Sequence, residues 1–168
     1  GADMSLSGKV TVVAGADADA KAVEQVVSVL RDLPGAQVSV SRTPDASGDQ
    51  VWVGTAETTP GIDGLVASLG GSKAATLPAD GYVIASGRRS GHNVIALQGK
   101  DARGTFYAVQ TLRQLVRHDK VASVTVRDWP LMPIRGGIEG FYGIPWSHQA
   151  RLDQFTFYGR HKMNTYIY

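Results

Sequence analysis

The sequence predicts an α+β domain, built of layered helices and strands over residues 9–130, followed by the start of a second, parallel unit. Short apolar runs typical of strands alternate with segments of helical periodicity as far as Asp128. Pro130 and Pro133 then bracket a short connector. Beyond it a strand, a helix and a strand follow, a pattern typical of a parallel sheet or of the opening of a barrel.

Composition limits the classes of function. The chain has 168 residues, of which 43% are hydrophobic, enough for a packed core. Its 17 basic and 15 acidic residues give a net charge of +2 and do not cluster, which argues against a nucleic-acid partner. There is no cysteine for a disulfide framework or a thiolate metal site, and no apolar run approaches a membrane span. Residues 1–8 are expected to be a tag or a disordered start.

The first half of the domain is expected to alternate strands and helices. Residues 20–33 carry apolar side chains at helical spacing, with Asp17 or Asp19 as the N-cap. A ligand loop at residues 15–17, as in a nucleotide binder, is the weaker reading of that turn. Strands are expected at 9–14, 36–41 and 50–54, and a short helix at 61–69.

Three side chains in this region are candidates for a functional role. Trp52 is expected in the core rather than as a stacking platform, because Val51 and Val53 mark a strand inside the sheet. Strands at 81–86 and 92–98 predict a hairpin with a five-residue loop. Arg88 and Arg89 in that loop could contact an anion, although exposed arginines are more often simply solvated.

The longest helix is expected over residues 100–118, with Asp101 as the N-cap and a last strand at 121–126. Gly104 lies in its first turns, where glycine costs about 1 kcal/mol against alanine unless it permits close packing on the sheet. Tyr107 is expected at the margin of the helix's buried stripe, which comprises Phe106, Val109, Leu112, Leu115 and Val116.

The segment that follows the connector is rich in glycine and aromatic residues. Its four glycines, Gly136, Gly137, Gly140 and Gly143, indicate a strand whose backbone something approaches closely, or positive φ angles. Glu139 is expected at a strand end that faces a pocket. Residues 163–168 are apolar and β-branched like a buried strand, so we expect the chain to be a piece of a longer protein.

The residues present make at most half of an active site. The four histidines are dispersed, and neither a Gly-x-Ser-x-Gly elbow nor a phosphate loop occurs, so metal and cofactor sites are not expected. After Trp129 the only acids are Glu139 and Asp153, which do not form a catalytic carboxylate pair. Phe141, Tyr142 and Trp146 could line one wall of a sugar pocket, or they could be core residues beside tightly packed glycines.

Two stretches of this sequence resemble a known family. Residues 137–146, then Arg151 and residues 162–168, resemble the opening of the catalytic barrel in glycoside hydrolase family 84. These are β-N-acetylglucosaminidases that include O-GlcNAcase-like enzymes and proteins called hyaluronidases. Residues 104–115 resemble the helix of the α/β domain that precedes the barrel in this family and in the family 20 hexosaminidases.

The resemblance implies a hexosaminidase domain-2-like α/β domain over residues 9–130 and the first two strands of a truncated TIM barrel over residues 131–168. It implies a retaining, substrate-assisted enzyme, in which the sugar's own acetamido oxygen attacks the anomeric carbon. The two aspartates that assist it would follow the fourth barrel strand, so no catalytic residue is expected in this chain and the isolated piece should be inactive.

Residue by residue, the resemblance implies that Gly140, Phe141 and Tyr142 contact the sugar, whereas Glu139 has a structural role. The expected partners are a carbohydrate substrate and the remainder of the parent chain, without cofactor or metal, in an extracellular or periplasmic protein. The alternative from the residues alone is a stand-alone carbohydrate- or protein-binding module without catalysis.

Overall fold

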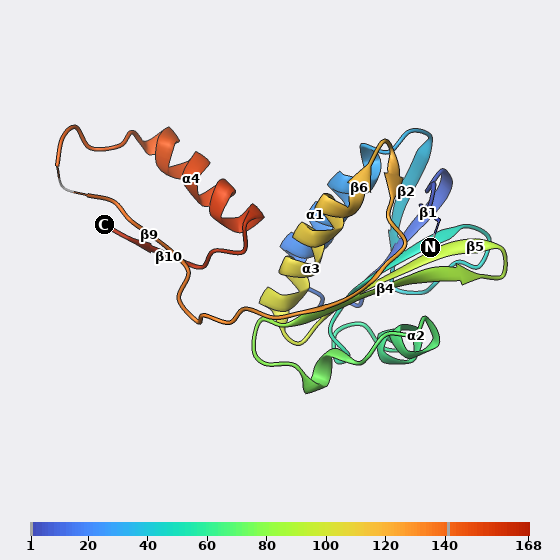
Figure 1. The fold of residues 1–168 in the computed structure, drawn as a ribbon. Coiled ribbons are helices and arrows are strands. Elements are labelled where there is room, and N and C mark those ends of the chain that lie inside the picture. Colours follow the sequence, from blue (N-terminus) through green and yellow to red (C-terminus); the bar gives the residue numbers. More distant parts are fainter. Residues whose placement is uncertain (1, 141) are drawn as a thin grey trace. The chain divides into compact units, whose positions relative to one another are not determined.

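The computed structural model describes residues 2–140 and 142–168. The chain forms two compact units, Gly1–Trp129 and Pro130–Tyr168 (Figure 1). The first unit contains β1 (Gly8–Val13), α1 (Ala20–Arg31), β2 (Ala36–Ser41), β3 (Asp49–Gly54), α2 (Ile62–Ser68), a 3-10 turn η1 (Ala74–Thr76), β4 (Tyr82–Arg89), β5 (His92–Gly99), α3 (Ala102–Leu115), β6 (Val116–Arg117), β7 (Lys120–Val121) and β8 (Thr125–Asp128).

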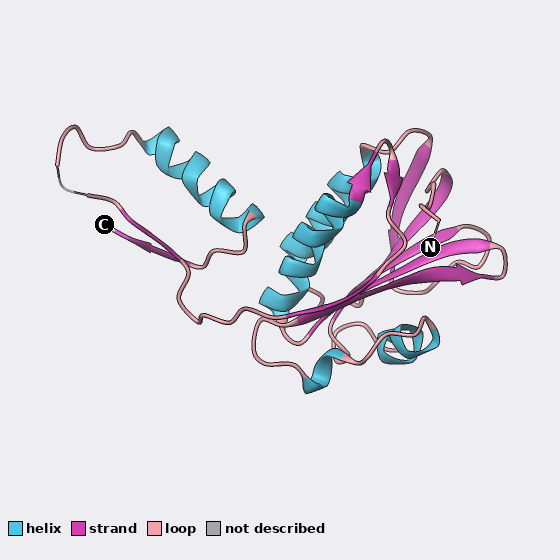
Figure 2. Cartoon of the chain, in the orientation of Figure 1, coloured by secondary structure: helices cyan, strands magenta, loops and turns pink. Residues whose placement is uncertain are grey.

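A mixed six-stranded sheet organises the first unit, in the order β2-β1-β3-β5-β4-β8. The strands β2, β1, β3 and β5 run parallel, whereas β4 is antiparallel to both β5 and β8. Helices α1 and α3 cover one face and α2 lies over the other (Figures 1 and 2). The predicted α+β class is therefore confirmed.

Side-chain alternation along the strands divides the core into two clusters. Val51 and Val53 of β3 are fully buried against α1 and α3, together with Ile95 and Leu97 of β5. Trp52 points to the opposite face, where it packs at the edge of the smaller cluster under α2. The short α2 covers only part of that face, and Trp52 is half-buried rather than enclosed.

The structure corrects the predicted turn between β4 and β5. Strands β4 and β5 pair as far as Arg89 and His92, so the predicted five-residue loop is a two-residue turn at Ser90 and Gly91. Both turn residues have positive φ, 50° and 85°, which matches the right-handed twist of the two strands. Arg88 closes the turn by donating from Nη2 to the carbonyl oxygen of Gly91 at 2.5 Å.

Helix α3 ends at Leu115, three residues before its predicted end, because Val116 and Arg117 pair with Lys120 and Val121 in a small hairpin. The predicted last strand over 121–126 is thereby replaced by β7 and the later β8. Within α3, Tyr107 is 3% exposed and Phe106 only partly buried, which reverses their expected places.

Residues 4–8 fold with the first unit, contrary to the disordered start that was one of the two expectations for residues 1–8. Met4 exchanges backbone hydrogen bonds with Val121 at 2.7 and 2.9 Å, and both Met4 and Leu6 are buried in the main core. Gly8 already belongs to β1. Residues 4–8 are therefore part of the folded unit.

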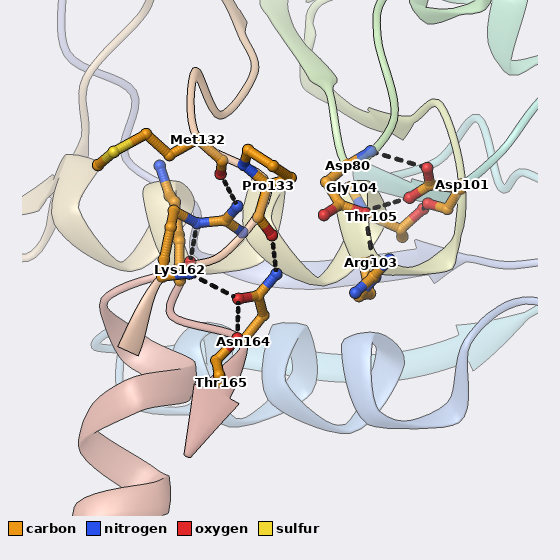
Figure 3. Close-up of polar contacts among 11 residues, drawn as sticks. Asp80, Asp101, Arg103, Gly104, Thr105, Met132, Pro133, Lys162, Asn164 and Thr165 are labelled. Atoms are coloured by element: carbon orange, nitrogen blue, oxygen red, sulfur yellow. Dashed lines mark hydrogen bonds and ion pairs between the residues drawn. The ribbon is translucent and has the colours of Figure 1, made fainter. Parts of the chain in front are cut away.

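Both long helices of the first unit begin at the predicted aspartate caps. Asp19 accepts from the backbone N–H of Ala22 at 2.7 Å. Asp101 accepts from Gly104 N with one carboxylate oxygen and from Asp80 N with the other, each at 2.8 Å (Figure 3). Asp80 is in turn paired with Arg103 Nε at 3.0 Å.

The second unit contains β9 (Gly136–Ile138), α4 (His148–Arg160) and β10 (Thr165–Ile167). The two strands pair in parallel, with Gly136 opposite Thr165 and Ile138 opposite Ile167. This is the predicted strand–helix–strand step. Its last strand is shorter than the expected 163–168 and only partly buried.

Candidate functional site

Glu139 directly follows β9 and is the centre of a polar cluster within the second unit. Its backbone N–H donates to the carbonyl oxygen of Ile167 at 2.8 Å, which extends the pairing of β9 with β10. The side chain of Glu139 points to the same face of the strand as position 137, and Glu139 is only 7% exposed. The carboxylate is therefore turned into the unit rather than toward solvent.

Arg151, in the first turns of α4, holds this carboxylate with a two-pronged contact. Its Nε donates to Oε2 and its Nη2 to Oε1 of Glu139, both at 2.9 Å. The Tyr166 hydroxyl also donates to Oε2, and the backbone N–H of Trp146 approaches Oε1 at 3.3 Å. Strand β9, helix α4 and strand β10 are thus joined through one carboxylate.

These contacts fix the charge state of the cluster. The hydrogen bonds from Arg151 and then Tyr166 lower the pKa of Glu139 to about 2. Burial, followed by the hydrogen bond to Glu139, raises the pKa of Tyr166. A carboxylate that stays ionised and fully engaged is poorly suited to proton transfer near neutral pH.

A small cavity of about 200 Å³ lies beside the cluster. Glu139, Gly140, Gly143, Pro145, Arg151 and Tyr168 line it. The Arg151 guanidinium carbon lies 5.1 Å from the centre of the Tyr168 ring, a cation–π contact that braces the cavity wall. The predicted pocket beside Glu139 is therefore present within this unit.

The three predicted sugar-contacting residues have different positions. Gly140 lines the cavity and is exposed. Tyr142 is fully exposed, at 100%, on the loop that leads toward α4. Phe141 lies outside the described residues. Trp146 is 44% exposed in this chain.

The glycines of this segment serve distinct purposes. A Cβ atom on Gly136 would lie 1.6 Å from the carbonyl oxygen of Thr165, so only glycine permits β9 to approach β10. A Cβ on Gly137 would meet the Tyr158 hydroxyl at 2.3 Å. A Cβ on Gly140 would meet nothing within 4 Å. Packing among the residues that the structure describes does not explain the glycine at position 140.

A second polar network fixes the start of β9. Asn164 accepts from the backbone N–H of Arg135 at 2.9 Å and donates to the carbonyl oxygen of Pro133 at 2.8 Å (Figure 3). Arg135 in turn donates to the carbonyl oxygens of Met132 and Lys162 at 2.6 and 2.8 Å. The loop before β10 thereby sets the position of the strand that carries Glu139.

Sequence reasoning did not identify Tyr166 as a partner of Glu139, nor the Arg151 contact. Arg151 lies 12 residues from Glu139 and Tyr166 lies 27 away, so no local spacing links them. The usable signal was a lone acid at the end of an apolar strand, because a buried carboxylate is usually paired with a cation or hydrogen-bonded. In the part of the chain that the structure describes, no group of three metal-ligating side chains occurs, and no helix is long and apolar enough to cross a membrane.

The Glu139 cluster predicts how the second unit responds to acid. The pKa of Glu139 in the folded unit lies below its ordinary value of 4.5. The ionised carboxylate therefore stabilises the folded unit fully above pH 4.5, and this stabilisation is lost as the pH falls toward 2. Glu139→Gln should lower the stability of this unit at pH 7 and flatten its dependence on pH between 5 and 2.

Chemical-shift changes of Tyr166 and the β9 amides during an acid titration measure this effect. The exposed Asp153, which contacts only Gln149 among the described residues, provides the control substitution Asp153→Asn. An unchanged acid profile in Glu139→Gln would contradict the assigned role.

Comparison with known proteins adds to this geometry. The family model of glycosyl hydrolase family 20, domain 2, matches residues 1–129, and that of beta-N-acetylglucosaminidase matches residues 135–168. The solved structure of CpGH84B is 28% identical with a TM-score of 0.76, over 100% of this chain and 27% of that one. That of CpGH84D is 25% identical with a TM-score of 0.81, over 98% of this chain and 28% of that one.

A third structure shares the fold alone. It is BtGH115A, described as a 4-O-methyl-alpha-glucuronidase with specificity for decorated arabinogalactans, and it is 16% identical with a TM-score of 0.67. The match covers 96% of this chain and 25% of that protein. The chain therefore spans about a quarter of the length of each of these solved proteins.

Proposed function

Since the chain belongs to the glycosyl hydrolase family 20 domain 2 family and continues into a β-N-acetylglucosaminidase segment, we propose that it is the N-terminal portion of a retaining β-N-acetylglucosaminidase. The parent enzyme would hydrolyse terminal β-linked N-acetylglucosamine outside the cytoplasm, in an extracellular or periplasmic location. The first unit would support a catalytic barrel whose first two strands are β9 and β10.

One observation supports this proposal most directly. Glu139, the acid that follows β9, is ion-paired with Arg151. The next residue, Gly140, has no side chain, and its backbone lines a cavity. Such a strand end can offer backbone hydrogen-bonding groups to a polar ligand without a side chain in the way. A sugar with several hydroxyl groups fits these requirements.

The exposed side chains of the second unit are consistent with a larger barrel. Ile138 and Ile167, paired across β9 and β10, are 73% and 52% exposed, although β-branched side chains are usual in sheet cores. In the proposed parent, closing the barrel would turn this face inward, where side chains from the other strands would cover it. Gly140 would then lie at the carboxyl ends of the barrel strands, where barrel enzymes bind substrate.

The proposed reaction is substrate-assisted. The 2-acetamido oxygen would attack the anomeric carbon, the bond to the leaving-group oxygen would break, and a general acid would give that oxygen its proton. Water would then open the oxazoline, with the same residue taking a proton from water, so configuration is retained. This chain would contribute binding through Gly140, Phe141 and Tyr142, and the two assisting acids would come from the remainder of the parent.

The chemistry of the acetamido group tests this mechanism. Aryl glucosaminides that carry acetyl, fluoroacetyl, difluoroacetyl and trifluoroacetyl groups should be cleaved progressively more slowly by the longer protein. The fall should reach at least about a hundredfold, because fluorine weakens the carbonyl oxygen as a nucleophile. Equal rates across the series would rule out participation of the acetamido oxygen.

The exposure of Tyr142 and Trp146 also favours a second candidate, a carbohydrate-binding module without catalysis. Titration of the 168-residue chain with N-acetylglucosamine oligomers separates the two. Tight, saturable binding by the chain alone would support the module, whereas the enzyme proposal expects weak or undetectable binding to this single wall.

A further inference from the structure

A second cavity, in the first unit, is unrelated to the strand end around Glu139. It has a volume of about 260 Å³ and lies on the face of the sheet that α2 only partly covers. Its apolar lining includes Pro44, the half-buried ring of Trp52 and the buried Val94. Its polar lining includes the hairpin residues Arg89, Ser90 and His92.

The Trp52 ring is held in one orientation. Its indole Nε1 donates to Gln50 Oε1 at 2.9 Å, and Gln50 Nε2 donates to the carbonyl oxygen of Asp45 at 2.9 Å. Gly61 lies close to the ring, since a Cβ there would be 3.6 Å from it. The indole N–H is therefore already used, and what the ring offers to the cavity is apolar surface. A fixed aromatic surface binds a ligand without first losing rotamer freedom.

Arg89 supplies the charge of this cavity, and both Arg89 and His92 offer polar groups to it. Neither side chain has a hydrogen-bonding or ionic partner among residues 2–140 and 142–168, whereas the neighbouring Arg88 is used to close the hairpin turn. Two acids that flank lining residues in the sequence are engaged elsewhere, because Asp45 pairs with Lys9 and Asp49 accepts from the backbone N–H of Asn93 at 2.8 Å. No acid is among the described residues that line the cavity, which therefore presents the Arg89 guanidinium beside an aromatic ring.

We propose that this cavity binds an acidic sugar unit, a single pyranose that bears a carboxylate, with its ring against Trp52 and its carboxylate on Arg89 and His92. An arginine fork matches the two oxygens of a carboxylate. The volume is below the roughly 300–1,000 Å³ of sites for larger ligands, so it suits one ring with its substituents. The binding would be independent of whether the parent cleaves N-acetylglucosaminides.

A matched pair of ligands tests the proposal on the 168-residue chain. Methyl β-D-glucuronide and methyl β-D-glucoside differ only in the carboxylate, and backbone amide shifts report where each binds. We expect saturable shifts confined to residues 44–52 and 89–94, with a Kd of about 1 mM for the glucuronide, as expected for so small a ligand. The glucoside should bind at least about tenfold more weakly.

Substitutions identify the groups responsible. Arg89→Ala should weaken glucuronide binding about tenfold without changing glucoside binding, and Trp52→Ala should remove both. Arg31→Ala, an exposed arginine at the end of α1, is the charge-matched control and should have no effect. Because Trp52→Ala could disturb the core, Trp52→Phe is the milder variant and should retain part of the affinity.

Three results would overturn the proposal: no saturable shift with either sugar, equal affinity for the charged and the neutral sugar, or glucuronide binding that Arg89→Ala leaves unchanged. Tighter binding of a nucleoside monophosphate than of the glucuronide at these residues would assign a different ligand class and would also overturn it.

Discussion

Gly104→Ala is expected to destabilise the first unit, although alanine is the better helix former by about 1 kcal/mol. Gly104 lies in the first turns of α3, where the helix meets the loop before β4. A Cβ at this position would lie 2.1 Å from the carbonyl oxygen of Gly81. That oxygen is held in place because it accepts from the backbone N–H of Lys100 at 2.8 Å.

The clash involves backbone on both sides, so neither partner can move aside by changing a rotamer. Overpacking of this kind costs about 1–3 kcal/mol or more, and we expect a net loss of about 2–3 kcal/mol. For a unit of this size the loss corresponds to a fall in melting temperature of roughly 10 °C. Thermal unfolding followed by circular dichroism measures it.

Gly64→Ala is the matched control for this substitution. Gly64 is also helical, in α2, but it is exposed and a Cβ there meets nothing within 4 Å. This substitution should raise stability by about 0.5–1 kcal/mol. If both variants shifted stability in the same direction, the close approach of α3 to Gly81 would not be the reason for the glycine at 104.

Gly140→Ala is expected to reduce the activity of the proposed longer enzyme by about ten- to a hundredfold, because a displaced sugar loses its alignment with the reacting groups. It should leave the folding of the second unit unchanged, since the added methyl group faces open space. The effect should appear in kcat/KM for an aryl N-acetyl-β-glucosaminide, with an unaltered melting temperature.

The comparison with Gly136 separates a ligand contact from a packing effect. Gly136→Ala would place a methyl group 1.6 Å from the Thr165 carbonyl oxygen and should disrupt the pairing of β9 with β10. Activity would then fall together with stability. Full activity of Gly140→Ala would exclude the backbone at position 140 as part of the sugar site.

Helices and strands whose apolar residues recur at a regular spacing were predictable from the sequence. The buried face of α1, the alternation around Val51 and Val53, and the caps Asp19 and Asp101 all depend on residues close together in the chain. Close packing was a predicted reason for Gly104, since a glycine in a helix's first turns costs stability. The expected partner was the sheet, however, and the actual one is the Gly81 carbonyl in the loop before β4.

Features set by distant residues were not predictable in this way. Val116 continues the apolar period of α3, yet it leaves the helix to pair with Val121. Arg88 and Arg89 lie on the end of β4 that projects beyond the buried part of the sheet. Because their side chains are polar, this paired strand end looked in the sequence like part of a five-residue loop. The partners of Glu139 come from α4 and β10, and only the fold brings them together.

Turnover of an aryl N-acetyl-β-D-glucosaminide, measured side by side for the 168-residue chain and for a longer protein that continues through the proposed barrel, tests the central claim most directly. The account predicts no turnover above background for the chain, whose only acids after Trp129 are the ion-paired Glu139 and the exposed Asp153. It predicts a kcat of about 1 s⁻¹ or more for the longer protein, with retained configuration. Hydrolysis by the 168-residue chain itself, or a folded longer protein with none, would contradict it.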